Sequence, residues 1–196
     1  MTRIGILGGT FNPIHTGHLI VAQIIRESLD LKRIIFVPAQ KHPLKDSRFI
    51  ADEAHRAKMI RLAIRNNKFM EVSDVELGSD QVTYTVDTVK KIQADSAGRT
   101  WDIYFLMGMD NLNQLHLWKN PDLLIEMCQI VVFSRPGFKP AKEARRYLSR
   151  IRIIQIPLLE ISSTQIRQRV NSGKTIRYLV PEEVEAYIIK NSLYTT

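Results

Sequence analysis

Cysteine and long apolar runs are what this sequence has least of. Cys128 is the only cysteine among 196 residues, which excludes a disulfide within the chain and a zinc site built on cysteines. The longest apolar runs, such as Leu19–Ala22 and Ile103–Met107, fall far short of the ~20 residues that span a bilayer. The first residues, MTRIGILGGTF, lack the apolar core and cleavage site of a signal peptide. We therefore expect a cytoplasmic protein without membrane contact, with Cys128 in its core.

Negative charge is also in deficit. The chain carries 28 Lys and Arg against 20 Asp and Glu, a net charge of +8 at pH 7. This excess predicts anionic partners, and it leaves open nucleic acid, a membrane surface and small phosphorylated molecules. The contents of hydrophobic (44%) and charged (24%) residues are those of a globular protein, which excludes a disordered or fibrous chain. The length fits one domain over residues 1–196.

Strand-like and helix-like segments alternate along the chain, and this alternation is typical of a parallel sheet covered by helices. We expect strands at 3–7, 33–37, 70–75, 103–107, 130–133 and 151–156. Helices are expected at 16–29, 52–65, 85–94 (with Thr83 or Thr85 as N-cap), between 108 and 127, and at 141–149, 162–172 and 181–191. The predicted fold class is α/β: a doubly wound, mainly parallel sheet with a small C-terminal helical cap at about 160–196. Ligands of such sheets bind beyond the carboxyl ends of the strands.

The segment after the first strand, GGTFNPIHTGH at residues 8–18, opens the first helix. Paired glycines and a helix N-terminus favour a bound anion. The segment is neither a Walker A loop nor the dinucleotide fingerprint. His15 and His18, three residues apart, fall on one face of a helical turn. We expect them to bind phosphate. The two alternatives are that they are two ligands of a metal site, or that they are polar surface residues without a function.

A second polar cluster, ISSTQIR, lies at residues 161–167. Ser162 is a good N-cap, the hydroxyls of Ser163 and Thr164 surround a helix start, and Arg167 follows one turn later. This arrangement suits a phosphate clamp, although an ordinary capped helix with a surface arginine would have the same pattern. Asp110, just after the predicted strand 103–107, is suited to accept hydrogen bonds from ribose hydroxyls or to cap the next helix.

These segments resemble known signatures. GGTFNPIHTGH is similar to the signature of bacterial nicotinate-nucleotide adenylyltransferases, within the HxGH nucleotidyltransferase superfamily, whose other branches more often have Thr in place of His15. ISSTQIR resembles the second signature of that superfamily, and TYTVDT at residues 83–88 resembles the stretch that receives the nicotinate carboxylate. The resemblance implies a Rossmann-like nucleotidyltransferase fold. It also implies transfer of adenylyl from ATP to nicotinate mononucleotide, giving nicotinate adenine dinucleotide and pyrophosphate in NAD biosynthesis.

The resemblance further implies a set of site residues. The catalytic residues would be His15, His18 and Arg167. ATP would be bound by Gly8, Gly9, Thr10, Phe11, His18, Gly108, Asp110, Ser163, Thr164 and Arg167. Nicotinate mononucleotide would be bound by Lys45, Tyr84, Thr85, Trp118 and Arg135. Mg²⁺ would arrive with ATP, and no resident metal site is expected. The chain departs from the family pattern at Asn12, where Asp is common, and at His42 and Leu44.

Parts of the sequence are compatible with three other functions. One is a nucleotidyltransferase with a different acceptor, but Trp118 and the Tyr84–Thr85 segment favour a pyridine nucleotide. Another is a nucleic-acid-binding protein that uses Arg145, Arg146, Arg150 and Arg152, but no nucleic-acid-binding signature accompanies this cluster, which we interpret as a solvated helix face. A third is a nucleotide sensor without activity, which the intact His15, His18 and Arg167 disfavour. The sequence leaves self-association, and the degree of preference for nicotinate over nicotinamide, open.

Overall fold

The sheet of this protein is parallel throughout. The computed structural model describes residues 1–40, 50–78, 82–95, 100–134, 140–157 and 159–195. Within them, the strands are β1 (Thr2–Gly9), β2 (Arg33–Pro38), β3 (Met70–Val72), β4 (Trp101–Gly108), β5 (Gln129–Ser134) and β6 (Ile151–Gln155). They form one sheet in the order β3-β2-β1-β4-β5-β6, and every neighbouring pair is parallel.

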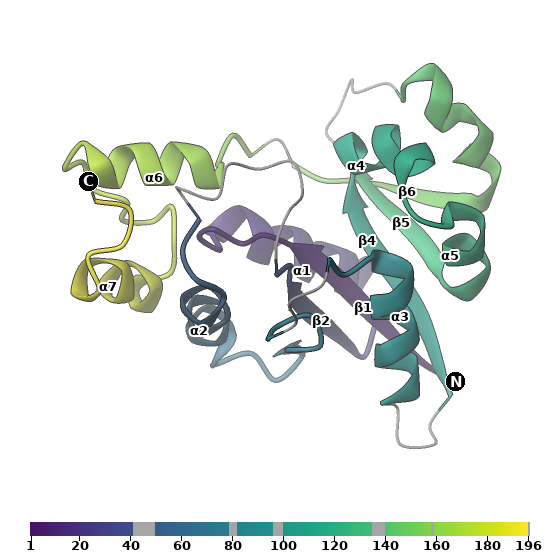
Figure 1. Cartoon of the computed structure of the whole chain (residues 1–196), viewed down its shortest axis with the longest axis horizontal. Coiled ribbons are helices and arrows are strands. Elements are labelled where there is room, and N and C mark those ends of the chain that lie inside the picture. Colours follow the sequence, from purple (N-terminus) through teal and green to yellow (C-terminus); the bar gives the residue numbers. More distant parts are fainter. Residues whose placement is uncertain (41–49, 79–81, 96–99, 135–139, 158, 196) are drawn as a thin grey trace.

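Helices cover both faces of the sheet, because successive side chains of each strand point to opposite faces. On one face, Leu7, Phe36 and Leu106 are buried against α1 (Thr16–Ser28), α2 (Glu53–Ile64), α6 (Ser163–Asn171) and α7 (Glu182–Lys190). On the other, Ile6, Phe105 and Val132 are buried against α3 (Thr85–Ala94), α4 (Met109–Gln114), η2 (Leu115–Leu117), α5 (Pro121–Met127) and η3 (Lys142–Arg150). In Figure 1, α2, α6 and α7 lie to the left of β1 and β4, and α5 lies to the right. The predicted doubly wound fold is confirmed.

The cap formed by α6 and α7 packs into the same core as α1 and α2. Ile166, Val184 and Ile188 are buried in the cluster that contains residues of the sheet. Two polar contacts fix α7 to α2: His55 Nδ1 lies 2.9 Å from the Tyr187 hydroxyl, and Arg65 pairs with Glu183 at 2.8 Å.

Two of the sequence predictions need correction at element ends. The third strand ends at Val72 rather than at residue 75, because Asp74 turns away to pair with Arg61 of α2 and its carbonyl accepts a bond from the N–H of Leu77. The N-cap of α3 is Tyr84, between the two threonines that were expected.

The basic segment that follows β5 is a 3₁₀ helix, η3, rather than a regular α-helix. Its buried residues, Ala144 and Tyr147, are three apart, and residues at this spacing line up along one edge of a 3₁₀ helix. Arg145, Arg146 and Arg150 are exposed on η3, as expected for a solvated helix face, whereas Arg152, also exposed, lies on β6. Arg150 reaches Asp122 at 3.5 Å.

Cys128 is buried, as expected, and its thiol donates to the carbonyl of Leu124. No helix in the described part of the chain combines the length and the apolar character that crossing a bilayer requires.

Candidate active site

Two cavities open where the strand order reverses, between β1 and β4. The first, of about 900 Å³, lies between the turn after β1, the start of α4 and the start of α6. The second, of about 380 Å³, lies between the end of β1, the start of α3 and the segment around Trp118. Among the described residues, Thr10 alone lines both. The cavities therefore meet at Thr10, at the position where open α/β sheets bind their ligands.

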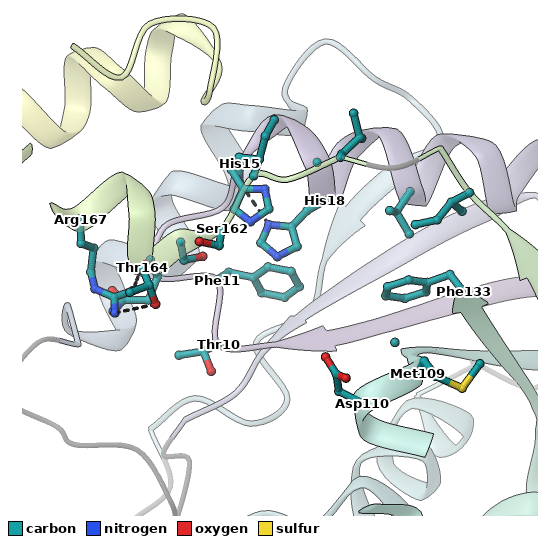
Figure 2. A pocket seen from close by; sticks show the side chains of 18 of the residues that line it. Thr10, Phe11, His15, His18, Met109, Asp110, Phe133, Ser162, Thr164 and Arg167 are labelled. Carbon is teal, nitrogen blue, oxygen red and sulfur yellow. Dashed lines mark hydrogen bonds between the residues drawn. The ribbon is translucent and has the colours of Figure 1, made fainter. Parts of the chain in front are cut away.

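The turn after β1 places two histidines in the first cavity. Phe11 adopts a positive φ of 47°, which turns the chain sharply, and its ring packs edge-on against His18. His15 is the N-cap of α1, and its ring stacks on that of His18 with the centroids 3.6 Å apart (Figure 2). A Cβ on Gly17 would lie 3.1 Å from His15 Nδ1, so a larger residue there would crowd the His15 ring.

Both histidines are neutral at pH 7. Burial lowers the pKa of His15 to about 4. Burial and the neighbouring His15 lower the pKa of His18 well below its usual value. The backbone N–H of His15 donates to Nδ1 of His18 at 3.2 Å, so the neutral His18 ring carries its proton on Nε2. His18 is therefore a neutral hydrogen-bond donor in the cavity.

The second signature is joined to the first by hydrogen bonds across about 150 residues of sequence. Arg167 donates to the carbonyl of Asn12 at 2.8 Å and to the Thr164 hydroxyl at 3.3 Å. The Ser163 hydroxyl donates to the carbonyl of Pro13 at 2.9 Å. Ser162 caps α6, as predicted, by accepting from the N–H of Gln165 at 3.2 Å. The start of α6 thus lies against the turn after β1, and its hydroxyls and Arg167 line the cavity (Figure 2).

Asn12, the departure from the family pattern, is a buried junction. Its side-chain oxygen accepts from the N–H of Ala51 at 3.0 Å and from the Tyr194 hydroxyl at 2.8 Å. Burial raises the pKa of Tyr194, which keeps this hydroxyl a donor. The neutral amide of Asn12 therefore links the first turn to the end of the cap.

The opposite wall of the first cavity belongs to β4, α4 and β5. Gly108 is the N-cap of α4, so Asp110 lies in the first turn of that helix rather than at its cap. Figure 2 shows Asp110 and Phe133 across the cavity from Arg167. An exposed carboxylate in this place is able to accept hydrogen bonds from a ligand.

The second cavity combines a helix start with an aromatic ring. Tyr84 and Thr85 begin α3, where the first N–H groups have no partner within the helix and favour a negative charge. Trp118 is half-buried, and its ring packs edge-on against Phe105 with centroids 6.2 Å apart. Lys119 holds Asp87 at 3.0 Å and lies 4.5 Å from the centre of the Tyr84 ring. This cavity suits a flat, anionic ligand.

The comparisons with known proteins agree with this geometry. The model of the cytidylyltransferase-like family matches residues 6–169. A probable nicotinate-nucleotide adenylyltransferase of a Thermoanaerobacter species is 42% identical over 98% of this chain and 94% of its own. Another, from Thermomicrobium roseum, is 40% identical over 100% of this chain and 93% of its own. This chain belongs to the nicotinate-nucleotide adenylyltransferase family.

Solved structures of proteins named as nicotinate-nucleotide adenylyltransferases share the fold of this chain. Plasmodium falciparum nicotinic acid mononucleotide adenylyltransferase, complexed with NaAD, superposes with a TM-score of 0.78 at 22% identity, over 99% of this chain and 98% of that one. A putative nicotinate-nucleotide adenylyltransferase of Vibrio parahaemolyticus gives a TM-score of 0.66 at 23% identity, over 99% and 96%. The nucleotidyltransferase fold implied by the signatures is confirmed.

Most of the residues that the family resemblance selected line one of the two cavities. The first holds Thr10, Phe11, His15, His18, Gly108, Asp110, Ser163, Thr164 and Arg167. The second holds Tyr84, Thr85 and Trp118, and also Gly8 and Gly9, which were expected beside ATP. Lys45 and Arg135, together with His42 and Leu44, lie outside the described residues. The individual roles of all these residues stay predictions.

Sequence reasoning missed three residues of the site. Glu76 lines the second cavity, accepts a bond from the Thr88 hydroxyl at 2.5 Å, and has its pKa raised by burial. Lys119 stands beside Trp118, and adjacency to that tryptophan was a usable signal. Arg56 is buried behind the cavity walls, and four of its hydrogen bonds go to backbone carbonyls, which carry no sequence signal. No group of three or more His, Cys, Asp or Glu in the described part of the chain is arranged to hold a metal.

Proposed function

We propose that this protein transfers the adenylyl group of ATP to nicotinate mononucleotide, giving nicotinate adenine dinucleotide and pyrophosphate. One observation carries the proposal. A large cavity, rich in hydrogen-bond donors suited to phosphate, and a smaller one, with an aromatic ring and a helix start, meet at Thr10. ATP occupies the first cavity and nicotinate mononucleotide the second. Their reacting phosphates then come together beside the turn after β1.

The chemistry requires positioning more than it requires a protein nucleophile. An oxygen of the acceptor's phosphate attacks the α-phosphorus of ATP, and the bond from that phosphorus to the oxygen bridging to the β-phosphate breaks. Pyrophosphate leaves with the electron pair. The attacking phosphate is already ionised near pH 7, so no general base is needed. Catalysis rests on alignment and on stabilising the negative charge of the transition state.

The neutral His18 supplies a hydrogen-bond donor for this charge. Its Nδ1 is occupied by the N–H of His15, so the proton on Nε2 is available to an oxygen of the transferred phosphate. The hydroxyls of Ser163 and Thr164, with Arg167, hold the rest of the polyphosphate. Asp110 binds the ribose hydroxyls of the adenosine.

Mg²⁺ enters as part of the MgATP substrate. Asp110 is the carboxylate that the described residues bring to the first cavity, and hydroxyls and imidazoles make up most of its other polar groups. This donor set fits an ion that keeps most of its ligands from phosphate oxygens and water. When bound, the ion neutralises phosphate charge.

The second cavity selects the acceptor. Trp118 stacks on the pyridine ring, and the first N–H groups of α3, at Thr85, bind the nicotinate carboxylate. A helix N-terminus favours a carboxylate over a neutral amide, so we expect the acid to be preferred. The cytoplasmic location expected from the sequence stays a prediction.

A pyrophosphate-release assay with a panel of acceptors tests this function. The panel contains nicotinate mononucleotide, its amide, phosphopantetheine and glycerol phosphate, each with MgATP. We expect release with nicotinate mononucleotide, a lower kcat/KM with the amide and none with the other two. Release with phosphopantetheine or glycerol phosphate alone would reassign the acceptor, and no release with either pyridine nucleotide would refute the proposal.

A further inference from the structure

Arg56, on α2, is a charged side chain that is almost completely buried. It is 1% exposed. Its Nε donates to the carbonyl of Ala51 at 3.0 Å, and its Nη2 donates to that of Gln40 at 3.0 Å. Its Nη1 donates to the carbonyls of Thr10 at 2.9 Å and Ala39 at 2.6 Å. One guanidinium therefore holds four backbone positions at once.

The four positions surround the two cavities. Thr10 lines both, and Ala39 and Gln40 line the second. Ala51 follows Ile50, which lines the first. These contacts connect the turn after β1, the exit of β2 and the chain just before α2.

A backbone hydrogen bond next to Thr10 also joins the turn after β1 to the exit of β2. The N–H of Ala39 donates to the carbonyl of Gly9 at 2.8 Å, so β1 and β2 are bonded at the residue before Thr10. Arg56 then fixes Thr10 itself, beyond the end of the paired strands. The guanidinium thus contributes to holding the Thr10 backbone in place.

The guanidinium of Arg56 stays charged, because arginine keeps its proton in proteins. Burial lowers its pKa, and the carboxylates of Glu53, Asp52 and Glu76 act in the opposite direction. Glu76 lines the second cavity, so one of the carboxylates that interact with Arg56 belongs to the wall of that cavity.

We propose that Arg56 is a positioning residue for adenylyl transfer, which fixes Thr10 where the cavities meet and so holds the two reacting phosphates in line. The inference rests on the proposed function. Arg56 touches neither cavity, so it acts through the backbone of Thr10, Ala39 and Gln40. Loss of this alignment lowers the rate of transfer more than it weakens the binding of either substrate, because each cavity keeps its own binding groups.

Arg56→Lys tests the proposal. Lysine keeps the charge, but its compact ammonium cannot bond four carbonyls in the fork geometry of a guanidinium. With both substrates saturating, we expect kcat to fall by about 100-fold, the scale of a misplacement of about 1 Å. The KM of each substrate should change by less than about fivefold. The matched control is Arg33→Lys, which alters the 2.9 Å pair with Glu71 at the opposite end of β2 and should leave kcat unchanged.

The outcomes are distinct. A folded Arg56→Lys variant with wild-type kcat, or with a loss confined to KM, overturns the proposal. Calorimetric titration with ATP counts the folded, binding-competent molecules, so kcat is expressed per competent site. A wild-type protein that releases no pyrophosphate with nicotinate mononucleotide instead defeats the proposed function.

If Arg56→Lys does not fold, the wild-type protein gives the answer. In protein with ¹⁵N-labelled arginine, we expect the Nε–H resonance of Arg56 to shift when either substrate is added alone, because its acceptors border both cavities. The Arg33 resonance should stay in place. An Arg56 resonance that responds to neither substrate contradicts the proposal.

Discussion

The backbone N–H of His15 donates to Nδ1 of His18 across 3.2 Å, and the two rings stack with their centroids 3.6 Å apart. This bond uses the acceptor nitrogen of His18 and leaves Nε2 as its proton-bearing nitrogen. The pair thus presents a fixed, neutral donor in the cavity that we propose binds the polyphosphate of ATP.

His18→Asn should lower turnover while preserving the fold. An asparagine oxygen is able to replace Nδ1 as the acceptor for His15, but the NH₂ group of this shorter side chain does not reach the position of the Nε2 donor. We expect kcat to fall by about 100- to 1,000-fold, the usual cost of removing one donor to a developing charge. Steady-state kinetics and circular dichroism measure the two effects. His18→Ala should lose as much activity and also some stability, and near-normal turnover in either variant would remove His18 from the mechanism.

Burial of His15 should make the protein less stable in acid. Its pKa is about 4 in the folded state and near 6.5 when unfolded. As the pH falls from 6.5 towards 4, the unfolded chain takes up a proton that the folded chain does not, so stability is lost over this interval. The loss is at most about 3 kcal/mol for this residue. Urea unfolding at pH 7.5, 6 and 5 should show a smaller loss for His15→Gln than for the wild type; equal losses would contradict the assignment.

Trp118→Leu should weaken the acceptor site selectively. Leucine keeps an apolar contact with Phe105 but offers no aromatic face to a pyridine ring. Stacking on an aromatic ring is worth about 1–3 kcal/mol, so the KM for nicotinate mononucleotide should rise by about 10-fold or more. The KM for ATP should change little. Trp101→Leu, at the start of β4, is the control, and a rise in the KM for ATP instead would place Trp118 in the other site.

Tyr194→Phe should destabilise the contact between the cap and the first turn. The variant loses the 2.8 Å bond to Asn12, and we expect the free energy of unfolding to fall by about 1 kcal/mol. Tyr178→Phe is the matched control, because Tyr178 is 81% exposed. Chemical denaturation of both variants measures the difference. Equal stability of the two would show that the Asn12 bond contributes nothing net.

Periodicity predicted most of the fold. Leu19, Ile20, Ile24 and Leu29 have the spacing of a helix, and α1 spans Thr16–Ser28. The errors arose where tertiary contacts decide an end. The strand at Met70 was expected to continue to residue 75. Asp74 instead pairs with Arg61 of the preceding helix, α2, a contact that the local sequence pattern does not reveal.

In the candidate site, too, local spacing predicted some residues, and tertiary contacts decided the others. The spacing of His15 and His18 alone placed both on one face, and the stacked rings confirm it. Asp110 was placed at a strand end because it follows the apolar run 103–107. Arg56 was not found, because an arginine in an amphipathic helix is normally exposed. Its acceptors are carbonyls between 5 and 46 residues away, and backbone groups carry no sequence signal.

Direct transfer between two substrates that meet at Thr10 is the central claim, and ATP labelled at the α-phosphorus tests it most directly. The purified protein is mixed with labelled MgATP and nicotinate mononucleotide, quenched at intervals and separated. The account predicts that the label appears in nicotinate adenine dinucleotide, in amounts equal to the unlabelled pyrophosphate released, with none on the protein at any time. Label bound covalently to the protein, or label that stays in ATP and AMP alone, would contradict it.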